Sequence, residues 1–173
     1  MIQLKPFHNS NFGKLIEWIE TEEELVQFSG SIFTFPLTVA QLSEYVKTPN
    51  SIIYKIVLEN GNINIGHAQI CKIDHHNKKA RISRILIGDK RYRGKGLSSL
   101  IIKELLSVVF VELNLFEVEL FVLKTNNPAI TCYRKSGFQI KNSIEDYVVK
   151  GEIIPLYEMT ISKEKWVEVG NLN

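Results

Sequence analysis

The sequence predicts an α+β (mixed α/β) domain in which a mixed, mostly antiparallel twisted sheet is flanked by helices. Three observations support this fold class. The first third of the chain has apolar residues at helical spacing, and the middle third alternates extended apolar runs with turn residues. A strand, a glycine loop, a helix and a strand then follow in order, a crossover unit that makes those two strands parallel neighbours or near neighbours. The length of 173 residues fits one domain spanning residues 1–173.

Short elements are expected in the first third. Residues 2–5 can form a strand, and Asn9 or Ser10 can cap a helix. The apolar side of this helix is formed by Phe12, Leu15, Ile16 and Ile19. A second short helix is expected after Thr38, because Thr38 and Gln41 have the spacing of a capping box.

Three strands are expected in the middle third. The runs 52–57, 63–73 and 80–87 are rich in β-branched residues. Asn60-Gly61 is a strong hairpin signal between the first two, and residues 74–79 supply the second turn. These strands therefore form an antiparallel meander that leads into the glycine loop.

The last part of the chain predicts two helices and three strands. A helix begins near Leu97, and the apolar run 116–123 has the composition of a buried central strand. Asn127 is expected to cap a short helix, with Pro128 in its first position and Gly137 just beyond its end. Two closing strands, at residues 138–141 and 156–161, are expected to be joined by a polar, acidic loop.

The total charge is too balanced to indicate a nucleic-acid or membrane partner. The formal net charge is +2, from 21 basic and 19 acidic residues. The basic residues are nevertheless concentrated at residues 78–95, around the glycine loop, where an anion is the natural ligand. Nucleic-acid binding through this stretch is weighed and set aside, because acidic residues crowd the first fifth of the chain. That acidic group is Glu17, Glu20, Glu22, Glu23 and Glu24, which either attracts a cationic substrate or forms a solvated helix face.

The cysteine content predicts a reducing, cytoplasmic location. Cys71 and Cys132 are too few for a disulfide framework, and the sequence has no C-x-x-C pair that would suggest zinc. We therefore expect no metal. The first residues lack the apolar core of a signal peptide, and no apolar run reaches membrane-spanning length.

The loop Arg91-Tyr92-Arg93-Gly94-Lys95-Gly96 has the form R-x-x-G-x-G and precedes a helix. Glycines let backbone amides approach a ligand closely, and the helix start adds unpaired N–H groups and the positive end of the helix dipole. A Walker loop is disfavoured because Leu97, not lysine, follows Gly96. A dinucleotide fingerprint is disfavoured because Ser99 stands where its third glycine would be.

The remaining interpretation is a resemblance to the GNAT superfamily of N-acetyltransferases, whose R-x-x-G-x-G loop wraps the pyrophosphate of acetyl-coenzyme A. A second signature of this family resembles the spacing of Asn126, Ala129, Tyr133 and the pair Gly137-Phe138. The amino-terminal part also resembles the branch that contains ribosomal-protein alanine N-acetyltransferases, through Trp18, the segment 33–38 and the late Trp166.

The resemblance implies a GNAT-like sheet with a splayed parallel strand pair that binds acetyl-coenzyme A as co-substrate. Backbone N–H groups of Ile85, Leu86 and Ile87 would orient the pantetheine arm and polarise the thioester carbonyl. Amides from Tyr92 to Leu97, which include those of Arg93, Gly94, Lys95 and Gly96, would hold the pyrophosphate. Arg91, Arg93 or Lys95 would add charge-assisted contacts.

Tyr133 is the expected general acid, because a phenol with a pKa near 10 can protonate a departing thiolate of comparable basicity. Asn126 is the expected polar contact to the coenzyme arm, and helix capping is its structural alternative. Cys132 is interpreted as a packing residue.

The general base is not assigned by the resemblance. Alanine N-acetyltransferases have a glutamate five residues before the signature asparagine, and here Phe121 stands at that position. Glu119 shares a strand face with Phe121 and is a candidate base, as is Glu117, although glutamates at a strand entrance are usually solvated. Histidine has an ordinary pKa suited to a base, but for His67, in a predicted strand, a role in the core or on the surface is favoured.

These observations predict direct acetyl transfer to a primary amine, such as a protein N-terminus, a polyamine or a small molecule, in a ternary complex. The alternative is a non-catalytic acyl-coenzyme A sensor or interaction module. The acceptor itself carries no recognised motif. Trp18, Phe28, Phe33, Phe35 and Tyr45 either line its pocket or belong to the core. Dimers are common in the family, so a homodimer is an assembly that the resemblance allows.

Overall fold

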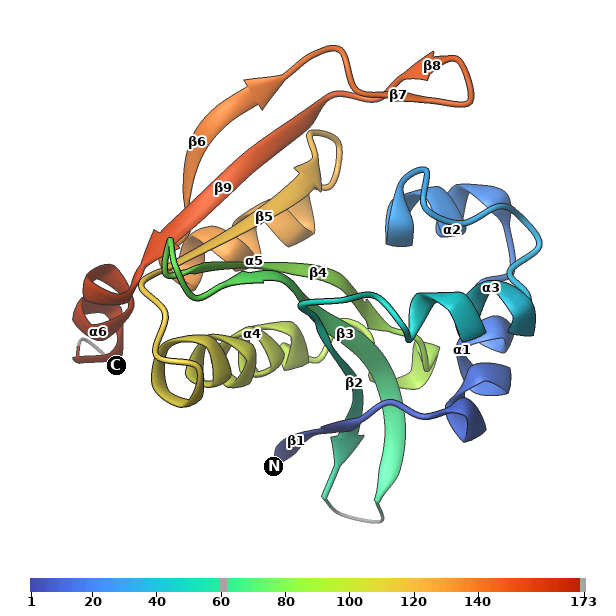
Figure 1. The fold of residues 1–173 in the computed structure, drawn as a ribbon, viewed down its shortest axis with the longest axis horizontal. Helices are drawn as coiled ribbons and strands as arrows, with labels where there is room; N and C mark the ends of the chain where they lie inside the picture. The colour runs from blue at the N-terminus through green and yellow to red at the C-terminus, as the bar shows by residue number, and fades with distance from the viewer. Residues whose placement is uncertain (60–61, 172–173) are drawn as a thin grey trace.

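The computed structural model describes residues 1–59 and 62–171. A seven-stranded sheet in the order β1-β2-β3-β4-β5-β9-β6 forms its centre, with helices packed on both faces (Figure 1). All neighbours in this sheet are antiparallel except β4 and β5, which are parallel. The predicted fold class, with its crossover unit, is therefore confirmed.

The first half of the chain forms one strand, three helices and the meander. These elements are β1 (Ile2–Pro6), a 3-10 turn (Asn9–Asn11), α1 (Phe12–Trp18), α2 (Glu22–Ser29), α3 (Val39–Tyr45), β2 (Ile52–Leu58), β3 (Ile63–Asp74) and β4 (Lys79–Ile87). Thr38 caps α3 as expected, because its side chain accepts a hydrogen bond from the backbone N–H of Gln41. The predicted turn at Asn60-Gly61 lies outside the described residues.

The second half begins with a 3-10 turn (Lys90–Tyr92), α4 (Leu97–Ser107) and a π-helical segment (Val108–Glu112). It continues with β5 (Glu117–Leu123), α5 (Asn127–Lys135), β6 (Gln139–Ile144), β7 (Val148–Val149), β8 (Glu152–Ile153), β9 (Leu156–Ser162) and α6 (Lys163–Asn171). The loop expected between the last two strands of the sheet contains the β7–β8 hairpin, and α6 was not predicted.

The helices divide the core into two clusters on opposite faces of the sheet. Ile85 and Ile87 pack with the cluster that contains α4, whereas Leu86 packs with the cluster of α1, α2 and α3. Alternate side chains of a strand point to opposite faces, so these two helix groups sandwich β4. At the end of β4, the buried ring of Trp18 covers Gly88, where an added Cβ would lie 1.9 Å from the indole.

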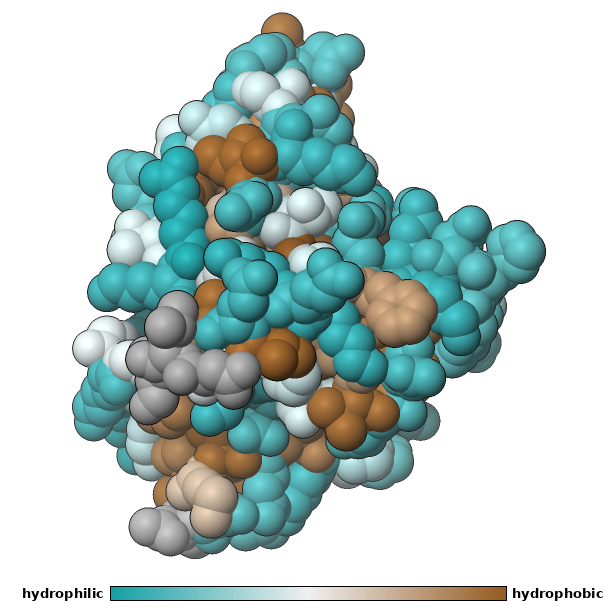
Figure 2. Space-filling model, turned by 90° about the vertical axis from the view of Figure 1, so that its left-hand side faces the viewer, coloured by the Kyte–Doolittle hydropathy of each residue, from teal (hydrophilic) through white to brown (hydrophobic). Residues whose placement is uncertain are grey.

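The face that carries α6 is mostly hydrophilic. Apolar residues form only separate patches on it (Figure 2). No helix in the described part of the chain is long and apolar enough to cross a membrane.

Candidate active site

The site is a cavity where the parallel strands separate. β4 and β5 pair only at Lys79–Glu117, Ala80–Val118 and Arg81–Glu119. Both strands continue beyond these pairs, and a cavity of about 810 Å³ opens between residues 82–87 of β4 and 120–123 of β5. The splayed pair implied by the resemblance is therefore present.

The cavity reaches both faces of the sheet. On one face α4 and α5 contribute Ser98, Ile102, Pro128, Ala129, Cys132 and Tyr133. On the other face α2 and the residues around the β7–β8 hairpin contribute Glu24, Gln27, Phe28, Gly30, Tyr147 and Ile154. The cavity thus has two ends that are lined by different elements. The first end lies near the glycine loop, and the second lies below the β7–β8 hairpin.

The strand end Ile85 to Ile87 forms one wall of this cavity. Its outer edge is paired with β3, through Gly66–Ile87 and His67–Leu86. The pairing of β4 with β5 ends at Arg81. Among the described residues, no strand therefore pairs with the inner edge of β4 along the cavity. Such an edge presents backbone N–H and C=O groups to an extended ligand.

The glycine loop lies at the end of β4 and leads into α4. Gly94 and Gly96 have φ of +72° and +74°, a conformation that favours glycine, and Gly96 is the N-cap of α4. Within the predicted loop, the structure places Arg93 and Gly94 in the cavity wall. The other loop residues, Arg91, Tyr92, Lys95 and Gly96, and Leu97 at the start of α4 are not part of the wall.

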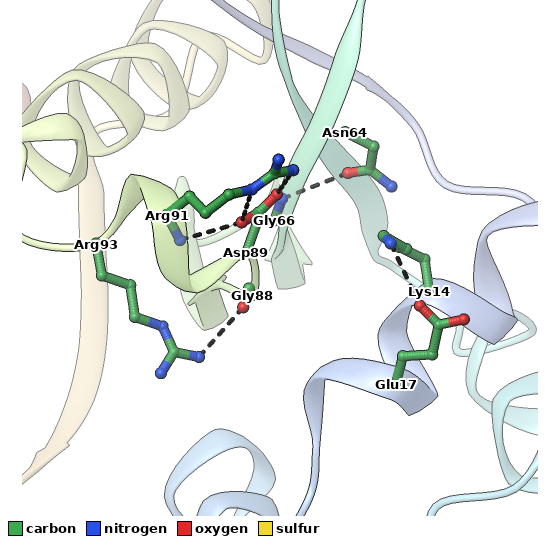
Figure 3. A network of polar contacts seen from close by, with 8 residues as sticks. All are labelled: Lys14, Glu17, Asn64, Gly66, Gly88, Asp89, Arg91 and Arg93. Atoms are coloured by element: carbon green, nitrogen blue, oxygen red, sulfur yellow. Dashed lines mark hydrogen bonds and ion pairs between the residues drawn. The ribbon is translucent and has the colours of Figure 1, made fainter.

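The two arginines of the loop make local contacts (Figure 3). Arg91 binds Asp89 through Nε–Oδ1 at 3.0 Å and Nη2–Oδ2 at 2.7 Å, and this hydrogen bond lowers the pKa of Asp89. Arg93 donates to the backbone oxygens of Ile87 at 2.8 Å and Gly88 at 3.3 Å. The arginines therefore brace the loop against the end of β4. The amides of Tyr92 and Arg93 are bonded to the backbone oxygens of Asp89 and Lys90, which leaves the amides from Gly94 onward and the exposed Lys95 as the donors of the loop for an anion.

The helix that carries Tyr133 begins one residue earlier than the sequence suggested. Asn126, not Asn127, is the N-cap, because its Oδ1 accepts a hydrogen bond from the N–H of Ala129 at 3.2 Å. An N-cap oxygen reaches the amide three positions ahead, and only Asn126 stands at that distance from Ala129. Pro128 consequently occupies the second helical position. Asn126 also lines the cavity, so both roles considered for it fit its location.

Tyr133 lies in the cavity wall with its ring edge-on to Phe138, at a centroid distance of 5.8 Å. Burial, with a smaller contribution from Cys132, raises its pKa to about 12. The phenol therefore stays protonated at neutral pH, and it is a weaker acid than the expected phenol with a pKa near 10. Among the described residues its hydroxyl has no hydrogen-bond partner, so its proton is available to a ligand.

Glu119 is held away from the cavity. Arg81 donates to its Oε1 from Nε at 2.8 Å and also from Nη2, and only 18% of the Glu119 side chain is exposed. The Arg81 guanidinium also lies 4.3 Å from the centre of the Phe121 ring. Arg81 and Phe121 line the cavity, whereas Glu119 and Glu117 do not.

His67 is a core residue, as the sequence analysis favoured. It is fully buried, with its ring nitrogens 3.0 Å from the Arg84 backbone oxygen and 3.3 Å from the Tyr45 hydroxyl. Burial lowers its pKa to about 4, so it is neutral at physiological pH. Of the five aromatic residues considered for the acceptor pocket, Trp18 and Phe28 line the cavity, Phe33 and Tyr45 are core, and Phe35 is exposed.

The acidic group of the first fifth is largely used in local contacts. Glu20 pairs with Lys90 at 2.7 Å, Glu22 with Lys150, and Lys14 with Glu17 at 3.2 Å. Glu24 accepts a hydrogen bond from the backbone N–H of Glu20 at 2.8 Å. Three of these glutamates occupy the first turn of α2, where negative charge complements the helix dipole. The interpretation as a surface helix face therefore fits this group except for Glu24, which also lines the cavity.

The sequence analysis grouped Arg81 and Arg84 with the basic residues around the glycine loop and did not consider Lys72, whereas the structure places all three at the α2 end of the cavity. In the sequence each of them is recognisable only as a basic residue within a predicted strand. Arg84 is placed there by its backbone conformation, with φ of +52°, which no sequence pattern predicted.

A sheet that opens between two parallel strands beside a glycine turn defines the class of acyl-coenzyme A-binding acetyltransferase folds. The chain belongs to the GNAT acetyltransferases, since the family described as "Acetyltransferase (GNAT) domain" matches residues 2–139. The superfamily resemblance is thus confirmed, and the alanine N-acetyltransferase branch stays a prediction.

Relatives and solved structures of this family are similar to the chain. Spermidine N(1)-acetyltransferase of Escherichia coli is 27% identical over 114 residues, which are 65% of this chain and 60% of that protein. The L-amino acid N-acetyltransferase AaaT of Escherichia coli is 32% identical over 72 residues, 41% of this chain and 44% of that protein. The crystal structure of spermidine N-acetyltransferase from Vibrio cholerae with CoA and spermine superposes with a TM-score of 0.81 at 19% identity, covering 96% and 98% of the two chains.

Proposed function

We propose that the protein transfers an acetyl group from acetyl-coenzyme A to a primary amine. The observation that carries this proposal is the cavity between β4 and β5, with an unpaired strand edge on one wall and Tyr133 on another. Family membership and the relatives' names, all N-acetyltransferases, support the same reaction.

The coenzyme would enter from the end of the cavity at the glycine loop. Backbone amides of Gly94 to Leu97 and the start of α4 would bind the pyrophosphate, because unpaired N–H groups and the helix dipole favour an anion there. The pantetheine arm would run along Ile85 to Ile87 as an added strand, and Asn126 would contact it. In this placement the thioester would lie near Tyr133.

The reaction needs no covalent enzyme intermediate. The lone pair of the neutral amine attacks the thioester carbonyl carbon, so a C–N bond forms and the C–S bond breaks. The thiolate that leaves takes a proton from Tyr133, and the amine nitrogen loses a proton to water or to a base. The products are the N-acetylated amine and free coenzyme A, and Tyr133 regains its proton from solvent.

The proton from the amine has two routes. Glu119 is one candidate base, although its Oε1 is already held by Arg81. A water chain to bulk solvent is the second route, and an amine that is already neutral in a desolvated cavity would need no base before the attack. The second route agrees better with the position of Glu119 outside the cavity wall.

The partners of the protein are the coenzyme and the amine, and we infer no nucleic acid and no membrane among them. A homodimer or a larger assembly of copies is part of the proposal, in line with the family. A cytoplasmic location is also part of the proposal, and it fits the absence of a membrane-crossing helix in the described residues.

Spermidine and spermine belong in the first panel of amines to be tested, because spermidine appears in the names of two of the relatives compared.

Calorimetric titration with acetyl-coenzyme A tests the cofactor, and release of free thiol across a panel of amines tests the transfer. We expect saturable binding and thiol release with at least one class of amine. Absence of binding at millimolar coenzyme would refute the proposal. Binding without thiol release from any amine would point instead to the acyl-coenzyme A sensor.

A further inference from the structure

Arg84 holds an unusual position in β4, on the wall of the cavity. Pairing with β3 passes from His67–Leu86 to Gln69–Ser83, so Arg84 and Ile85 together face the single residue Ala68. This is a β-bulge, a feature that redirects a side chain. Arg84 has φ of +52°, which is uncommon for a residue with a Cβ atom and indicates that the surroundings impose it.

Neutral groups hold the guanidinium of Arg84. Its Nε donates to Gln69 Oε1 at 2.7 Å and to the Tyr45 hydroxyl at 3.3 Å, and its Nη2 also donates to Gln69. The guanidinium lies 5.1 Å from the centre of the Tyr45 ring. The ion pairs of the described residues do not include Arg84, so this half-buried cation has no carboxylate partner there.

The contacts that the protein itself makes around Arg84 are costly. Gln69 is fully buried, and its oxygen is directed at Arg84, while its amide nitrogen has no hydrogen-bond partner among the described residues. A partly desolvated cation without a counter-charge and a buried unpaired N–H both lower stability. An anion bound at Arg84 would offset the first of these costs.

Most of the charged side chains that line the cavity near Arg84 are basic. Arg81 and Lys72 line the same cavity, and Arg81 is neutralised by Glu119, whereas Lys72 is exposed. Glu24 is the one carboxylate of the cavity wall in the described part of the chain, and the N–H of Glu20 already binds it. A polycation would therefore meet more positive than negative charge at this end.

We propose that the acceptor amine carries a carboxylate, as an amino acid does, and that Arg84 binds this carboxylate. The inference rests on the proposed function and narrows its substrate class. Guanidinium and carboxylate form charge-assisted hydrogen bonds with matched geometry, which would orient the amine toward the thioester. The aromatic rings of Phe28 and Phe121, on the same cavity wall, would accept an apolar side chain.

The test compares amines that differ only in the carboxylate. L-Phenylalanine is paired with 2-phenylethylamine and L-lysine with cadaverine, and spermidine is included, in the thiol-release assay with wild type, Arg84→Gln and Arg84→Lys. We expect the amino acid of each pair to give the higher kcat/KM. We expect Arg84→Gln to lower that value roughly 10- to 100-fold, and to change it much less for the decarboxylated partner. Lys103→Gln, an exposed charge removal on α4, should leave the ratio within each pair unchanged.

Binding is measured separately, so that failure of catalysis and failure of this inference are distinguishable. With coenzyme A bound, the thermal midpoint should rise with L-phenylalanine but not with 2-phenylethylamine, and Arg84→Gln should abolish the rise. That result would uphold the carboxylate site even if no amine were acetylated. A preference for spermidine, an equal loss for both members of a pair, or a loss of acetyl-coenzyme A affinity in a folded Arg84→Gln variant would overturn it.

Discussion

Arg81 and Glu119 face each other at the last point where β4 and β5 are paired, joined by Nε–Oε1 at 2.8 Å. Beyond this pair the strands separate and the cavity begins. The ion pair therefore marks the closed end of the opening, and it determines whether Glu119 can act as a base.

Glu119→Gln should reduce turnover less than tenfold if the pair is structural, because Arg81 would lose its counter-charge but the cavity wall would remain. A general base contributes roughly 10²- to 10⁴-fold, so a loss of that size would assign the base to Glu119. Steady-state thiol release measures turnover. The double variant Arg81→Met with Glu119→Gln is the control, because it removes both charges together.

Tyr133→Phe should lower kcat by at least tenfold while the affinity for acetyl-coenzyme A stays within about twofold, because only the leaving thiolate needs the hydroxyl. The raised pKa, about 12, keeps the phenol protonated, so Tyr133 should cause no fall in rate below about pH 11. Kinetics and calorimetry separate the two effects. Tyr54→Phe, at a half-buried tyrosine outside the cavity wall, is the matched control. Unchanged turnover in Tyr133→Phe would reject its role as the acid.

Gly96→Ala should weaken acetyl-coenzyme A binding roughly tenfold, because a residue with a Cβ is strained at the φ of +74° that Gly96 adopts. The space around the added Cβ is open, so the effect would come from backbone strain and not from a clash. Gly13→Ala in α1 is the control, since its Cβ also meets open space and its φ is helical. Equal affinity for the two variants would contradict the proposed role of the loop.

Protonation of His67 should destabilise the fold at acid pH. Its folded pKa of about 4 lies below its ordinary value of 6.5, so the unfolded chain binds this proton first. Neutral, buried His67 therefore contributes roughly 3 kcal/mol to the free energy of unfolding. This contribution is fully present above pH 6.5 and is lost as the pH falls toward 4. Urea unfolding of wild type and His67→Gln across this range measures it, with His75→Gln in an exposed turn as the control. Parallel pH profiles of wild type and His67→Gln would show the expectation to be wrong.

Local patterns in the sequence were sufficient for most elements of the sheet and for the candidate cofactor site. Alternation of β-branched residues predicts the meander, and the positions of Gly96 and Tyr133 follow from short-range signals. A capping-box spacing was also present for α2, which the sequence analysis missed. Thr21 and Glu24 have the same spacing as Thr38 and Gln41, which correctly located α3. The cap of α5 was misplaced by one residue because Asn126 and Asn127 are chemically equivalent in the sequence.

The sequence by itself determined the periodicity of the elements, the crossover between β4 and β5 and the glycine turn, because each depends on residues close together in the chain. The tertiary structure decided where the strands separate, that Arg81 holds Glu119, and that the bulge directs Arg84 toward Gln69 and Tyr45. These are contacts between distant segments. Burial, pairing and the loss of solvent then decide which charges are neutralised and which remain for a ligand.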